Sequence, residues 1–81
     1  MKAKLHFDFD KECCVFIRAC TKDKKVVDFR YERPQRISDQ MLTQEARTIF
    51  LDMKAKSFQN ISELIGIFIA RDESQLNTFL N

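Results

Sequence analysis

The stretch AKLHFDFDKECCVFIRA, residues 3–19, decides the fold because apolar and polar side chains alternate through most of it. Alternation with a period of two is the mark of a β-strand with one face on a core and the other toward water. The pattern breaks at residues 10–12 and returns at residues 27–31, which read VDFRY. We therefore expect the chain to open with a three-stranded antiparallel meander. Its apolar positions are Ala3, Leu5, Phe7 and Phe9, then Cys13, Val15, Ile17 and Ala19, and finally Val27, Phe29 and Tyr31.

The alternation also predicts how these strands pair, because a shift of one residue would turn every apolar side chain toward water. The second and third strands are in phase when Ile17 lies opposite Phe29, with a loop around residues 21–24. The first and second strands are in phase when Phe7 lies opposite Val15. These pairings place all the apolar positions on one face of the sheet.

The other face of the same strands is expected to carry mostly charged pairs. In this register Arg18 lies opposite Asp28, and Cys14 lies opposite Asp8. Phe16 then stands exposed at the centre of the face.

A helix is predicted after Pro34, since proline removes a hydrogen-bond donor that a continuing strand would need. Ser38 and Thr43 are competing starts for this helix, and Thr43 is the better cap for its main body. The apolar stripe has the helical spacing i, i+3, i+4 and i+7. It consists of Ala46, Ile49, Phe50 and Met53.

The segment LIGIFIA, residues 64–70, has two interpretations. Residues 60–63, Asn-Ile-Ser-Glu, resemble a capping box, and the apolar residues around them keep a roughly helical spacing, which favours a second helix. A nearly unbroken apolar run with Gly66 inside also suits a buried strand. The expected fold is a single α+β domain, residues 1–81, in the order βββαα. The alternative is βββαβα, in which Leu64–Ala70 is a fourth strand.

The composition is typical of a small globular protein. Of 81 residues 44% are hydrophobic and eight are Phe, whereas disordered chains carry few aromatic residues. Fourteen basic and twelve acidic residues give a net charge of +2, far from the basic profile of a dedicated binder of duplex nucleic acid. No apolar run approaches the roughly 20 residues that span a bilayer. We expect no membrane contact, signal peptide or anchor.

The three cysteines predict a reducing compartment. Cys13 and Cys14 are adjacent, and Cys14 and Cys20 lie about 20 Å apart along one strand at about 3.3 Å per residue, so no intrachain disulfide framework fits. Cys13 is expected in the core, and Cys14 and Cys20 at partly exposed positions. The expected location is cytoplasmic.

No sequence pattern calls for catalysis, a metal or a cofactor, so the chain is not expected to be an enzyme. His6 is the only histidine, and with Asp8 nearby it could form an acid–base pair, but a surface histidine is the simpler interpretation. No glycine-rich loop could hold a phosphate. The cysteines lack the spaced pairs of a structural zinc site.

The surplus of apolar side chains in the last third of the chain predicts a protein interface. A chain of this size has little left to cover them if residues 64–70 are helical. We expect a small interaction module that acts as a regulator, inhibitor or accessory subunit. It would bind another protein, or itself as a homodimer, through this segment and the sheet edge. The candidate interface residues are Ile61, Leu64, Ile67, Phe68 and Ile69.

Nucleic-acid binding is the alternative function. Basic residues gather around the second hairpin and the strand after it, with an aromatic side chain close by, as phosphate contact and base stacking require. Acidic residues interleave with them, as on an ordinary solvated face. The candidate contacts are Lys22, Lys24, Lys25, Arg30, Arg33 and Phe16.

Overall fold

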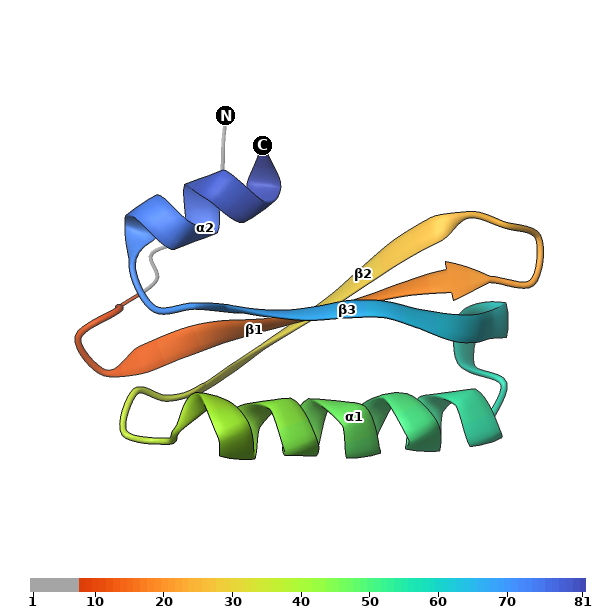
Figure 1. The fold of residues 1–81 in the computed structure, drawn as a ribbon, viewed down its shortest axis with the longest axis horizontal. Helices are drawn as coiled ribbons and strands as arrows, with labels where there is room; N and C mark the ends of the chain where they lie inside the picture. Colours follow the sequence, from red (N-terminus) through yellow and green to blue (C-terminus); the bar gives the residue numbers. More distant parts are fainter. Residues whose placement is uncertain (1–7) are drawn as a thin grey trace.

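The computed structural model describes residues 8–81 as an antiparallel sheet with a helix on each face (Figure 1). Strands β1, β2 and β3 lie in the order β2-β1-β3, so β1 is central. Helix α1 runs along one face, and α2 crosses only the end of the other face, where β1 begins and β3 ends. The elements in chain order are β1 (Glu12–Thr21), β2 (Val26–Pro34), α1 (Asp39–Ala55), the 3-10 turn η1 (Phe58–Asn60), β3 (Ile61–Ala70) and α2 (Glu73–Leu80).

The predicted hairpin of β1 and β2 is confirmed, register included. Ile17 pairs with Phe29 and Arg18 pairs with Asp28. The loop between the strands spans residues 22–25 and is closed by hydrogen bonds from the Thr21 amide to the Lys25 carbonyl and from the Lys24 amide to the Thr21 carbonyl, at 2.8 and 3.0 Å.

Residues 61–70 form a strand, so the second helix expected there is wrong and the strand interpretation is confirmed. The cause of the ambiguity is two irregularities in the pairing of β3 with β1, which leave Ser62 and Ile65 without partners in β1. Each extra residue shifts the alternation by one. Ile61, Leu64 and Ile67 therefore face α1 at a spacing of three, which imitates a helix.

The predicted first strand falls almost entirely outside the described residues, as does the pairing of Phe7 with Val15. Asp8 is described, and its carbonyl accepts hydrogen bonds from the amides of Lys11 and Glu12 in a turn. The residue opposite Cys14 on the side expected for Asp8 is Ala70 of β3, so that expected pairing is wrong.

The main core lies between the sheet and α1. One face of β1 contributes Cys13, Val15, Ile17 and Ala19, all fully buried. The predicted stripe of α1 packs on them, with Ala46 and Phe50 buried and Ile49 and Met53 at the margin. Helix α1 begins after Ser38, whose hydroxyl accepts a hydrogen bond from the Met41 amide at 3.2 Å, so the preference for Thr43 as the cap is wrong.

Arg71 joins the end of β3 to the connection between β2 and α1. Its guanidinium donates to the carbonyls of Gln35 and Ile37, at 2.8 and 2.6 Å, and to the Asp39 carboxylate at 2.7 Å. The Gln35 side-chain amide in turn donates to the carbonyls of Phe9 and Arg71, at 2.7 and 2.8 Å. These bonds hold one end of the sheet and the start of α1 in a fixed arrangement.

Neither helix of residues 8–81 combines the length and the apolar character that crossing a bilayer requires.

Candidate protein interface

The structure places all five predicted interface residues on β3. Ile61 is buried, and Leu64, Ile67 and Ile69 are half-buried against the core that α1 covers. Phe68 points to the opposite face and is 40% exposed. The five residues therefore lie on one strand but on two faces of the sheet.

The free edge of β3 is apolar in its second half. Within residues 8–81, β3 pairs with β1 on one side and with no strand on the other. Ile65, one of the two residues without a partner in β1, is 51% exposed at this edge. Soluble proteins usually protect such an edge with charged residues, proline, β-bulges or a covering loop. In β3 the exposed Glu63 and the irregularities at Ser62 and Ile65 lie before Gly66, and residues 66–70 contain no charge, proline or irregularity. Sequence reasoning missed Ile65 because the residue was assigned to a helix.

Phe16 is buried, in contrast to the exposed position expected for it. Its ring lies 4.1 Å from that of Phe79 in α2, measured between centroids, and only 3% of the residue is exposed. Cys14 beside it is also buried, and burial raises the pKa of its thiol to about 11. Both expectations of exposure fail for one reason, which is that α2 folds back over this end of the face.

Helix α2 is short and is held by few contacts. Asp72 caps it by accepting a hydrogen bond from the Gln75 amide at 2.8 Å. Leu76 and Phe79 pack against the small cluster of Cys14, Phe16 and Ala70. A helix of eight residues is not stable alone in water, so these contacts keep α2 folded.

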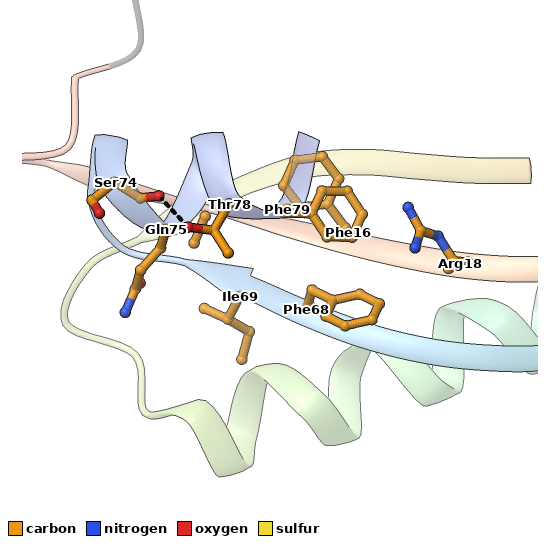
Figure 2. Close-up of a pocket in the computed structure, with 9 residues that line it drawn as sticks. Phe16, Arg18, Phe68, Ile69, Ser74, Gln75, Thr78 and Phe79 are labelled. Atoms are coloured by element: carbon orange, nitrogen blue, oxygen red, sulfur yellow. Dashed lines mark hydrogen bonds between the residues drawn. The ribbon is translucent and has the colours of Figure 1, made fainter. Parts of the chain in front are cut away.

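A hollow of about 480 Å³ lies between α2 and the sheet (Figure 2). We call it the α2 hollow. It lies over β1 and β3, since β2 supplies none of its lining. The Phe68 ring stands at its β3 side, 4.9 Å from Phe79 between centroids, and lies across Gly66, where a Cβ atom would be 3.2 Å from the ring. The residues that shape it are Phe16, Arg18, Phe68, Ser74, Thr78 and Phe79.

Arg18 closes one end of the α2 hollow (Figure 2). Its guanidinium donates two hydrogen bonds to Asp28, at 2.8 and 3.1 Å, and lies 4.7 Å from the centroid of the Phe79 ring. The bond to Asp28 raises the pKa of Arg18. The aromatic walls and this paired cation suit a large apolar side chain better than a free acid.

Two exposed cations of α1, Arg47 and Lys54, lie by helical spacing on the side of the helix opposite Glu45. Asp39, at the start of α1, contacts Arg71 directly after β3. Glu45 pairs with Arg33 of β2 at 3.0 Å. No described ion pair involves Arg47 or Lys54.

The candidate nucleic-acid contacts do not form one surface. Lys22, Lys24 and Lys25 share the hairpin loop, where Lys25 lies 3.7 Å from the Asp23 carboxylate. Arg33 sits at the far end of β2 and pairs with Glu45. Arg30 is exposed on β2, and Phe16, the expected stacking ring, is covered by α2.

His6, the residue considered for an acid–base pair with Asp8, lies outside the described residues. No cluster of three or more His, Cys, Asp or Glu side chains within residues 8–81 could hold a metal ion. Cys13, Cys14 and Cys20 are free thiols, with Cys13 in the core and Cys20 partly exposed as expected.

Comparison with known proteins adds no assignment, because no family model, curated protein sequence or solved structure matches this chain.

Proposed function

We propose that this protein is a small non-enzymatic interaction module that binds another protein through the edge of β3. The observation that carries the proposal is the exposed apolar edge itself, with Ile65 at 51% and Phe68 at 40% exposure. Edge strands present unpaired N–H and C=O groups, which a partner chain can pair with in register. A module of this kind acts as a regulator, inhibitor or accessory subunit of its partner.

The test is affinity capture of the tagged protein from lysate of its source cells, with bound proteins identified by mass spectrometry. The wild type is compared with Ile65→Asp, which places a charge at the β3 edge. The matched control is Met41→Asp, which makes the same kind of change at an apolar residue of α1 that is 62% exposed and lies on a different side of the helix from Arg47 and Lys54. Half of each sample is treated with nuclease.

A protein that Ile65→Asp loses and Met41→Asp retains, in both halves, supports the proposal. Loss with both variants, or with neither, contradicts it. Capture that disappears after nuclease treatment identifies nucleic acid as the bound species and also contradicts it. Analytical ultracentrifugation tests whether the protein is a homodimer. If the wild type is a dimer and Ile65→Asp is a monomer, the partner is a second copy of the chain.

A further inference from the structure

We infer that the partner contributes an extended segment that adds to β3 as a fourth strand, with apolar residues alternating with acidic ones. This inference rests on the proposed function and names the chemistry of what the β3 edge binds. The apolar residues would face α2 and the acidic residues would face α1.

The alternation follows from the geometry of an added strand. Successive side chains of any strand point to opposite faces of its sheet. The two faces next to β3 differ, because α1 lies along one and α2 covers only the end of the other. A segment paired with β3 therefore meets two different surroundings at alternate residues.

On the α2 face, the nearest surroundings are apolar. Phe68 is 40% exposed and lines the α2 hollow on its β3 side. The hollow, at about 480 Å³, has room for a large side chain, and three aromatic rings form its walls. A Leu, Met or Phe of the segment would bury apolar area there and act as its anchor.

On the α1 face, the surroundings are basic. Arg47 and Lys54 lie by helical spacing on the side of α1 opposite Glu45, which contacts Arg33 of β2; both are exposed and have no ion-pair partner among the described residues. Asp or Glu side chains of the added strand would supply the missing opposite charges.

The same cations argue against a second copy of this chain as the occupant. Antiparallel pairing of two β3 strands about a two-fold axis would place both α1 helices on the same face, side by side. Arg47 and Lys54 of one copy would then face the same basic pair of the other. The one acidic residue of β3, Glu63, lies opposite Cys20 and therefore on the face away from α1, where it cannot compensate.

Selection from a displayed library of random nine-residue peptides on the immobilised protein tests the pattern directly. Enriched peptides should have apolar residues at every second position and Asp or Glu between them, and should not bind Ile65→Asp. Enriched peptides that lack the alternation, or that carry Lys or Arg at the alternate positions, would overturn the inference. So would a selection in which every enriched peptide also binds Ile65→Asp.

Charge and shape are then tested with one enriched peptide by fluorescence anisotropy at low salt. Arg47→Glu combined with Lys54→Glu should weaken binding about tenfold, whereas Lys24→Glu with Lys25→Glu, the same charge change at the hairpin loop, should leave it unchanged. Thr78→Trp, which fills the α2 hollow, should weaken binding at least tenfold, and Asn77→Trp, outside its lining, should not. If the two double charge variants weaken binding equally, the role of Arg47 and Lys54 is refuted. If the two Trp variants weaken it equally, the role of the α2 hollow is refuted.

The two proposals fail separately. If capture depends on Ile65 but the selected peptides lack the pattern, the interaction module stands and the alternating segment is wrong. If capture finds no protein dependent on Ile65, the interaction module falls whatever peptides are selected.

Discussion

Replacing Phe79 by Ala should release α2 from the sheet without unfolding the rest of the protein. Phe79 packs on Phe16 at 4.1 Å and on Phe68 at 4.9 Å between ring centroids, and Leu76 is the other apolar residue of α2 in that cluster. Truncating a fully buried Phe costs about 3–5 kcal/mol, and Phe79 is only partly buried, so we expect a loss of about 2–3 kcal/mol. The whole loss falls on the docking of α2, because the helix has no stability of its own.

Cys14 reports this release. The thiol is 1% exposed beneath α2, and burial raises its pKa to about 11, so it reacts with alkylating reagents only when α2 opens. A loss of about 2–3 kcal/mol corresponds to about 30- to 150-fold faster alkylation in Phe79→Ala. Mass spectrometry after timed alkylation would give separate rates for Cys14 and for Cys13, which lies under α1 and should stay protected.

Leu80→Ala is the control, since Leu80 is 60% exposed on the same helix and its removal should leave the Cys14 rate unchanged. A rate for Cys14 in Phe79→Ala within threefold of the wild type would refute the account of α2 docking. Parallel acceleration of Cys13 and Cys14 would refute it too, because it would mean that the two faces of the sheet open together.

Three further predictions concern stability, each measured by urea unfolding. Arg71→Ala should cost about 2–3 kcal/mol because it leaves backbone carbonyls of the β2–α1 connection unpaired, and Arg71→Lys should recover less than half. Lys24→Gly should stabilise by about 0.5–1 kcal/mol, since Lys24 has φ 65° in the left-handed region. Burial, followed by the Glu45 charge, raises the pKa of Tyr31 from 10.0 to about 12, so the protonated hydroxyl stabilises the fold below pH 10 and this contribution is lost between pH 10 and 12. Tyr31→Phe should lose stability less steeply in that range.

The hairpin was predictable because β1 and β2 keep strict alternation and are joined by a short loop. A slip of one residue would turn Val15, Ile17 and Ala19 away from Phe29, and the short loop disfavours a slip of two, so the correct pairing followed from burial and loop length together. The stripe of α1 was predictable for the equivalent reason, with a period of 3.6.

The position and form of β3 were not predictable in this way. Two extra residues, Ser62 and Ile65, break the alternation, so periodicity could not separate a strand from a helix, and the high isoleucine content was the remaining signal for a strand. The place of β3 beside β1 is a contact between segments distant in the chain. The burial of Phe16 depends on the same long-range information, because α2 can cover that face only after β3 has brought it there.

The central position of β1 sets an order of assembly. β1 reaches β2 across a four-residue loop, but about 40 residues separate its end from the start of β3. A tenfold longer connection raises the entropic cost of closure by about 2 kcal/mol, so the hairpin should form first and β3, with α2 behind it, should join last. The reverse order should hold for opening, and backbone amides of β3 should exchange with solvent sooner than those between β1 and β2. The surface proposed to bind a partner would thus belong to the part of the sheet that opens most readily, where pairing with a bound strand would increase local stability the most.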